Sequence, residues 1–262
     1  MYVSNKMEAS KEVMVIHTTP KERTEKQEHI ICEIPFTIVV NGRELATLQC
    51  SPTSLEYLAV GFLLSEGVLT RREDVKRTIL DDRGSHIRID VVANVKMETL
   101  VPRRLIGSAG VSFCRRRDAE AMSRVNSQLR VSTDKLLWLM QQFQTKSALY
   151  SLTRGNHSCA LYNADGTIKV FADDIGRCNA IDKVIGECLM KGISEEDKIL
   201  ATSGRISAEI VNEVAKRKIP VIISFGAPTN LALDLAKSVG LTVIGSVSEQ
   251  NLSIFTNDQR VV

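Results

Sequence analysis

The sequence of 262 residues, 44% hydrophobic and 25% charged, is typical of a globular protein with one large or two modest domains. Its 34 basic and 31 acidic side chains leave a formal net charge of +3, which argues against nucleic acid or a membrane as the default partner. No run of about 20 apolar residues could span a bilayer, and the first residues lack the apolar core of a secretory signal, so we expect a cytoplasmic protein.

The pattern of the first half predicts a smaller α+β domain over residues 28–102. Before it, the polar residues up to about 27 are expected to form a mobile or loosely attached arm. Asn41-Gly42 separates two apolar runs and predicts a β-hairpin, because both central residues of such a turn need positive φ.

Thr53 and Glu56 have the spacing of a capping box in front of a nearly all-apolar segment, which predicts a buried helix. A second hairpin is expected to turn at residues 82–84. In its return strand the apolar residues alternate and should share one face, namely Ile87, Ile89 and Val91.

Residues 103–131 show no clean periodicity and are predicted to form a long basic loop, which in a compact protein is usually functional or disordered. The segment contains Cys114 followed directly by Arg115, Arg116 and Arg117. A solvated basic loop and an anion-steering site explain these arginines equally well.

Residues 132–262 show a different pattern. A helix from Thr133 and a hairpin around residues 164–166 are followed by a helix over residues 177–191 that ends at Gly192. Strand and helix then alternate, which predicts an α/β domain with parallel strands and helices on the faces of the sheet.

Three strand–helix junctions of this half are candidates for an anion site: residues 173–177, 203–207 and 224–229. In open α/β sheets ligands bind beyond the carboxyl ends of the strands, where free backbone N–H groups of helix N-termini can hold phosphate. Ordinary turn chemistry would explain any one junction, but three at one end of one sheet favour a binding site.

The six cysteines are expected to be free thiols in a reducing compartment, and without a C-x-x-C pair or clustered histidines they predict no metal site. Cys114 is the leading nucleophile, since neighbouring positive charge lowers the pKa of a thiol. Cys178 is the alternative, because it lies in the first turn of a helix whose dipole favours thiolate. The other four are expected to be small core residues.

Several segments together resemble the FdhD-type accessory proteins of formate dehydrogenase. They are LAVGFLLSEG at 58–67, GNH at 155–157, DDIGRCNAIDKVIG at 173–186, ILATSGRISAEIV at 199–211 and IISFGAPTNLALDLAKSVGLTVIG at 222–245. The resemblance covers residues 30–247. The order of several motifs makes it more specific than any single Gly-rich turn.

The resemblance implies a sulfur carrier that takes persulfide sulfur from a cysteine desulfurase. It would deliver this sulfur to a molybdenum cofactor, bis-molybdopterin guanine dinucleotide, before the cofactor enters formate dehydrogenase. It also implies a homodimer and a C-terminal half similar to cytidine deaminases, with three layers. Together with the three junctions, it assigns these residues to cofactor binding: His157, Asp174, Gly176, Arg177, Asn179, Asp182, Lys183, Ser203, Gly204, Arg205, Ser207, Ser224, Gly226, Ala227, Pro228 and Thr229.

The chain departs from the family pattern in three places. First, the loop reads GSAGVSFCRRR, so either Val111 or Gly110 stands where a family cysteine is usual. Second, Cys178 occupies a position where His is usual. Third, residues 246–251 lack the aromatic residue and the arginine of the family's F-x-R segment. A second hypothesis is therefore a cofactor-binding chaperone without sulfur transfer. A deaminase-like hydrolase is excluded, because the H-x-E and P-C-x-x-C motifs of zinc deaminases are absent.

Overall fold

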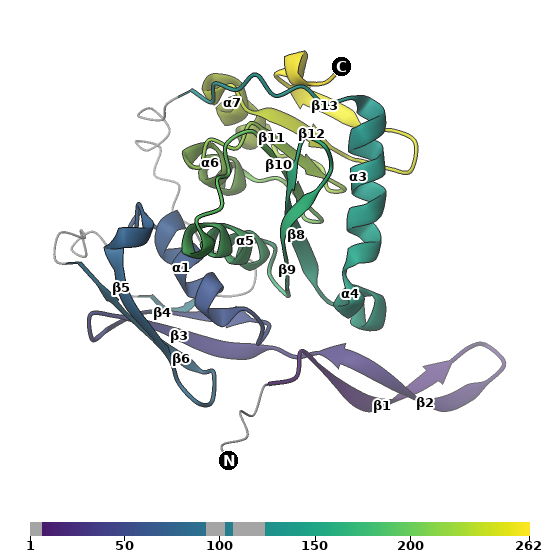
Figure 1. Cartoon of the computed structure of the whole chain (residues 1–262). Coiled ribbons are helices and arrows are strands. Elements are labelled where there is room, and N and C mark those ends of the chain that lie inside the picture. Colours follow the sequence, from purple (N-terminus) through teal and green to yellow (C-terminus); the bar gives the residue numbers. More distant parts are fainter. Residues whose placement is uncertain (1–6, 93–102, 107–123) are drawn as a thin grey trace.

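The computed structural model describes residues 7–92, 103–106 and 124–262, which form three sheets (Figure 1). A two-stranded hairpin projects from the body. A five-stranded sheet with the order β5-β6-β3-β4-β7 is built from the first half of the chain. A six-stranded sheet with the order β13-β12-β11-β10-β8-β9 is built from the second half.

The expected loose arm contains an antiparallel hairpin, β1 (Ser10–Thr18) and β2 (Arg23–Ile31). Two features stabilise this pair of strands despite its polar composition. Val13 and Val15 lie half-buried on one face of β1. Across the strands, the imidazole Nε2 of His29 lies 3.3 Å from a carboxylate oxygen of Glu12.

The five-stranded sheet begins with the predicted hairpin of β3 (Ile34–Val40) and β4 (Arg43–Cys50), and the positive φ values of Asn41 (46°) and Gly42 (79°) confirm its turn. The second hairpin, β5 (Val75–Leu80) and β6 (His86–Val91), is also confirmed, with all three predicted apolar side chains buried. Part of the predicted long loop instead forms β7 (Arg103–Ile106), which pairs with β4 in parallel.

The predicted buried helix is α1 (Leu55–Ser65). Its capping box is absent, because the N-cap is Ser54, which has a φ of 50° and makes no side-chain cap bond. Thr53 accepts a hydrogen bond from Lys183, and Glu56 accepts one from the hydroxyl of Thr78. A short 3-10 helix, η1 (Arg72–Asp74), leads from α1 to β5.

The six-stranded sheet comprises β8 (His157–Asn163), β9 (Ile168–Asp174), β10 (Lys198–Thr202), β11 (Val221–Ser224), β12 (Thr242–Gly245) and β13 (Ser253–Thr256). The prediction of parallel strands is confirmed for β10, β11 and β12. The sheet is nevertheless mixed, since β8 and β13 pair antiparallel with their neighbours. Because β9 is antiparallel to β8, and β8 to β10, strand β9 runs in the same direction as β10.

Helices cover both faces of this sheet, so the second half has three layers (Figure 1). One face is covered by α3 (Thr133–Lys146), whose buried side chains include Leu136, Met140 and Phe143. The other face is covered by α5 (Arg177–Lys191), α6 (Ala208–Lys216) and α7 (Asn230–Val239). The shorter helices are α4 (Ala148–Thr153) and, near the end of the chain, the 3-10 helix η2 (Asp258–Arg260).

The two halves share one hydrophobic core, in which α1 packs directly on α5. Two glycines allow the close approach. A Cβ on Gly61 would lie 1.9 Å from the backbone oxygen of Asp182, and a Cβ on Gly186 would lie 1.9 Å from that of Tyr57. No other residue fits at either position without moving the helices apart.

Candidate functional site at the carboxyl edge of the sheet

Strands β9, β10 and β11 end at the same edge of the six-stranded sheet, so their junctions with α5, α6 and α7 lie side by side. We call this region the carboxyl edge, made of residues 173–177, 203–207 and 224–229 with His157 at the start of β8. A Cβ on Gly204 would lie 2.8 Å from the Cβ of Arg177, and one on Gly226 would lie 2.7 Å from the Gly204 oxygen. The adjacency predicted from the sequence is confirmed.

Hydrogen bonds fix the second and third junctions to one another. The buried hydroxyl of Ser224 donates to the Gly204 oxygen (2.5 Å) and accepts from the Gly226 N–H (2.9 Å). The Ile206 N–H donates to the Ala227 oxygen (3.3 Å), and Thr229 N–H donates to the Ile206 oxygen (3.0 Å). These bonds hold the turns in one conformation, which is what a preorganised site requires.

His157 stands at the centre of this edge, with Nδ1 3.1 Å from the Ser203 hydroxyl oxygen. That oxygen also accepts the Ser158 N–H (3.0 Å), and its own proton can be donated to Nδ1 in the tautomer that carries the ring proton on Nε2. Burial, and then nearby Arg177, lower the pKa of His157, although Asp174 acts in the opposite direction. His157 is therefore a neutral ring that offers one N–H donor.

Two polar atoms at this edge are buried without a hydrogen-bond partner among the described residues: Nε of Arg177 and the hydroxyl oxygen of Ser207. Buried polar groups are normally satisfied, so such atoms indicate a place where a ligand or water completes the bonding. Arg205 is exposed beside them. The edge thus supplies two guanidinium groups, suited to phosphate, close to Gly204.

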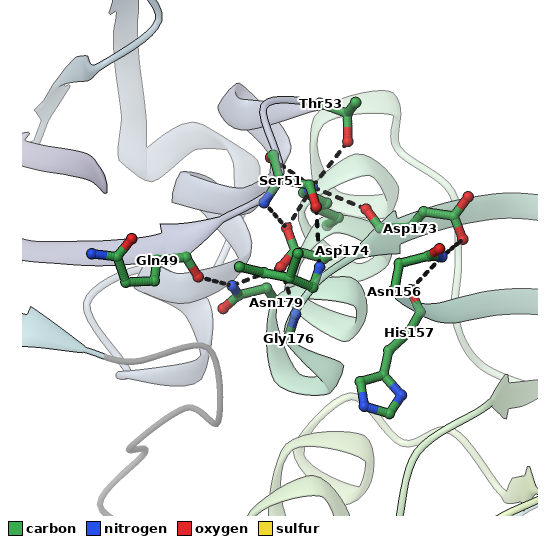
Figure 2. Close-up of polar contacts among 11 residues, drawn as sticks. Gln49, Ser51, Thr53, Asn156, His157, Asp173, Asp174, Gly176 and Asn179 are labelled. Atoms are coloured by element: carbon green, nitrogen blue, oxygen red, sulfur yellow. Dashed lines mark hydrogen bonds and ion pairs between the residues drawn. The ribbon is translucent and has the colours of Figure 1, made fainter. Parts of the chain in front are cut away.

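Other residues of the predicted set face inward. Asp174 and Lys183 form an ion pair whose side chains are completely buried, with 2.7 Å between Oδ2 and Nζ. Asp174 also accepts from the Ser51 N–H (3.1 Å), and Asn179 Nδ2 donates to Asp174 (2.9 Å) and to the Gln49 oxygen (2.9 Å) (Figure 2). These three predicted residues connect α5 to the segment between β4 and α1. Their side chains do not line the carboxyl edge.

Asp182 is likewise enclosed between α1, α5 and α6. Its Oδ1 accepts from the hydroxyl of Ser65 (2.7 Å), which also lies 2.5 Å from a carboxylate oxygen of Glu213. Burial, and then the proximity of Glu213, raise the pKa of Asp182 well above its ordinary value. In the described structure this carboxyl group also does not reach the carboxyl edge.

The expected activation of Cys178 by the dipole of α5 is wrong. Burial, and then nearby Asp182, raise the pKa of this thiol to about 12, because removing a thiolate from water outweighs the favourable helix terminus. Cys114, Arg115, Arg116 and Arg117 lie outside the described residues. As expected, Cys50, Cys159 and Cys188 are buried, whereas Cys32 is half-buried.

Sequence reasoning missed the residues that hold the buried network together. Ser51 and Thr53 contact the Lys183 ammonium, and Asp173 accepts bonds from Asn156 (2.9 Å) and Ser158 (2.6 Å). Ser51 and Thr53 lie about 130 residues from Lys183 in the chain, so no local pattern could have revealed these two partners.

The described part of the chain contains no group of three His, Cys, Asp or Glu side chains placed to hold a metal ion. Within the same residues, no helix combines the length and apolarity needed to cross a bilayer.

The fold and this edge define a three-layer α/β protein with a preorganised, partly basic site, packed against a smaller α+β unit. Residues 31–262 match the model of the FdhD/NarQ family, and the chain belongs to that family. It is 34% identical to the "Sulfur carrier protein FdhD" of Bacillus subtilis (strain 168), over 92% of this chain and 93% of that protein. It is 36% identical to the protein of the same name from Staphylococcus aureus (strain MRSA252), with 90% of each chain covered.

A crystal structure from Desulfotalea psychrophila, described as that of a formate dehydrogenase accessory protein, has the same fold. Its TM-score is 0.82 with 24% sequence identity, and the match covers 97% of this chain and 100% of that one.

Proposed function

We propose that this protein is a sulfur carrier that accepts sulfur from a cysteine desulfurase and passes it to a molybdenum cofactor before the cofactor enters formate dehydrogenase. Membership of the FdhD/NarQ family supports the carrier role. The observation that carries the cofactor part is the convergence of three strand–helix junctions at the carboxyl edge, beside Arg177, Arg205 and His157.

The client would be the bis-molybdopterin guanine dinucleotide form of the cofactor, bound as cargo. Its phosphates suit the backbone N–H groups of the junctions and the guanidinium groups of Arg177 and Arg205. The hydroxyl of Ser207, which has no partner among the described residues, and the ring of His157 would supply further donors. Of the sixteen residues predicted to bind it, Asp174, Asn179, Asp182 and Lys183 would act indirectly, by holding α5 in place.

Cys114 would carry the sulfur. Its thiolate attacks the outer sulfur of the desulfurase persulfide, a new S–S bond forms on Cys114, and the desulfurase cysteine leaves as thiolate, so no oxidant is consumed. Arg115, Arg116 and Arg117 would favour the thiolate form and steer the anionic cofactor. The high pKa of Cys178 supports Cys114 over the alternative thiol.

Three further features belong to this proposal. The C-terminal half would share the arrangement of cytidine deaminases, the protein would act as a homodimer, and it would work in the cytoplasm. A second candidate function is a cofactor-binding chaperone without sulfur transfer, favoured by the single cysteine in the loop sequence GSAGVSFCRRR.

Sulfur loading separates the two functions. The full-length protein is incubated with a cysteine desulfurase and cysteine, and its intact mass is measured before and after reduction. We expect one added sulfur that a reductant removes, no addition in Cys114→Ala, and normal addition in Cys178→Ala. If the wild-type protein gains no sulfur, the carrier proposal fails and the chaperone function replaces it.

Nucleotide binding tests the carboxyl edge independently of sulfur. We expect guanosine diphosphate, which represents one end of the cofactor, to bind, and Arg205→Ala to weaken binding roughly tenfold, since a charge-assisted contact contributes about 1.5–3 kcal/mol. Isothermal titration calorimetry measures this, with exposed Arg43→Ala as the matched control. Equal affinity in Arg205→Ala and wild type would remove Arg205 from the site.

A further inference from the structure

A cavity of about 380 Å³ lies at the opposite edge of the six-stranded sheet, where α7 ends and β12 begins. Its wall is formed by residues 124–128 and 130, by Gly240 at the end of α7, and by residues around the turn after β13. The volume is within the range of small-molecule sites, which is roughly 300–1,000 Å³. Neither the carboxyl edge nor the proposed sulfur chemistry uses this cavity.

Arg260 is the central cation of the cavity wall, and only 3% of the residue is exposed. Its guanidinium donates to the oxygens of Gly240 (2.8 Å), Val125 (3.0 Å) and the Thr242 hydroxyl (3.0 Å), all of them neutral groups. Among the described residues its Nε has no hydrogen-bond partner, and none of their carboxylates forms an ion pair with it. A buried charge without a counter-ion is normally costly, so this guanidinium suits an anionic ligand.

Two more arginines line the same cavity, Arg124 and Arg130, and both are exposed. Arg130 donates to the neighbouring Leu129 oxygen and has no acidic partner in the described chain. No Asp or Glu of the described residues lines the cavity. Asp197 stands at its margin, where it accepts the hydroxyl of Ser127 (2.5 Å). Three arginine side chains thus line one cavity.

The amide side chains of the wall complete a polar lining. Gln128 and Gln259 are exposed at the cavity, whereas Nδ2 of Asn257 donates to the Ala236 and Leu241 oxygens and so caps the end of α7. A wall of guanidinium and amide groups offers donors to phosphate oxygens and little apolar surface to a hydrophobic ligand.

We propose that this cavity, lined by Arg124, Arg130 and Arg260, is a second anion site that binds a small phosphate-bearing molecule. Arg260 provides a fixed positive charge at the base, held by three backbone and hydroxyl oxygens. Arg124 and Arg130 provide the exposed, adjustable guanidinium groups that reach the ligand. The site is independent of the proposed function, because it lies at the amino end of β12, away from the carboxyl edge.

The test measures pyrophosphate binding to the full-length protein by isothermal titration calorimetry. The background is Arg205→Ala, which weakens the carboxyl edge. We expect saturable binding that falls at least about tenfold when Arg124→Gln and Arg130→Gln are combined, since two charge-assisted contacts are removed. Both side chains are exposed, so the fold should be unaffected. The exposed pair Arg23→Gln and Arg43→Gln is the matched control and should leave the affinity unchanged.

Inorganic phosphate and guanosine diphosphate serve as additional ligands in the same background. If inorganic phosphate or guanosine diphosphate competes with pyrophosphate, the result supports the site. The ligand with the higher affinity shows whether free phosphate or an organic phosphate binds better. Absence of pyrophosphate binding, or equal affinity in the Arg124/Arg130 double variant and its background, would overturn the proposal. If only Arg205→Ala abolishes binding of guanosine diphosphate, the proposal for the cavity is unaffected. The proposals for the cavity and for the carboxyl edge can therefore be refuted separately.

Discussion

Ser65 lies between two carboxyl groups and cannot satisfy both in their ionised form. Its hydroxyl is 2.7 Å from Asp182 Oδ1, 2.5 Å from Glu213 Oε1 and 3.0 Å from the Gly61 oxygen, yet it carries one proton. A second proton, held by one of the two carboxyl groups, would satisfy the remaining acceptor. Burial is the main cause that raises the pKa of both.

The charged and titratable groups around this pair act in both directions. Glu66 on α1 raises the pKa of Asp182 further, whereas Lys216 and Arg217 on α6 lower that of Glu213. The carboxyl pair in turn raises the pKa values of Cys178 on α5 and Cys159 on β8. Burial and the acidic neighbours outweigh the basic ones, so the net effect raises the pKa of both carboxyl groups.

Because the folded pKa values are raised, the pair should make stability depend on pH. Its contribution is complete below the ordinary carboxyl values of 3.8 and 4.5, and it is lost as the pH rises through the raised folded values. We expect the free energy of unfolding to be lower at pH 8 than at pH 6, by up to about 1.4 kcal/mol for each pH unit over which the folded state keeps the extra proton. Glu213→Gln should remove most of this difference in urea titrations, whereas exposed Glu249→Gln should retain it. An identical pH dependence in Glu213→Gln and wild type would contradict the shared proton.

The same residues show how far sequence reasoning reached at the candidate site. The motif DDIGRCNAIDKVIG identified a polar segment at the start of a helix, but it could not show which side chains face a ligand. Asp182 and Lys183 are enclosed because α5 is covered by both the sheet and α1. Arg177, by contrast, keeps an unpartnered Nε at the carboxyl edge. That distinction depends on tertiary contacts.

At the scale of elements, the predictions succeeded where the periodicity of apolar residues was strong. They failed where a strand forms only because a neighbouring strand pairs with it. The alternation of β6 and the Asn41-Gly42 turn are local signals, and both are confirmed. Strand β7 has only four residues and exists because β4 offers it an edge, so the segment appeared to be loop. The hairpin of β1 and β2 was missed because its composition is polar.

The failed capping box at α1 has a similar origin. Spacing alone placed Thr53 and Glu56 at the helix start, but the buried Lys183 ammonium lies 3.1 Å from the Thr53 hydroxyl oxygen. A buried ammonium needs acceptors more strongly than an exposed helix terminus needs a cap. The chain consequently begins α1 from Ser54, in a left-handed conformation.

At the scale of the whole molecule, the two domains predicted over residues 28–102 and 132–262 pack against each other through one hydrophobic core. The glycine contacts between α1 and α5 and the Asp174–Lys183 pair bound to Ser51 connect the two sheets. Such a shared interior favours cooperative unfolding, because neither half can separate without exposing apolar surface and a buried ion pair.

We therefore expect Gly186→Ala to destabilise both halves together. Its Cβ would lie 1.9 Å from the Tyr57 backbone oxygen, a clash with backbone that should lower the free energy of unfolding by about 3 kcal/mol. Hydrogen exchange measured by mass spectrometry should then show the same loss of protection in β3 and in β10. Gly192→Ala at the end of the same helix is the control. There φ is 66° and no atom lies within 4 Å, so only the conformational cost of about 1 kcal/mol applies. Faster exchange in β3 with β10 unchanged would mean that the halves unfold independently, and the single cooperative unit would have to be abandoned.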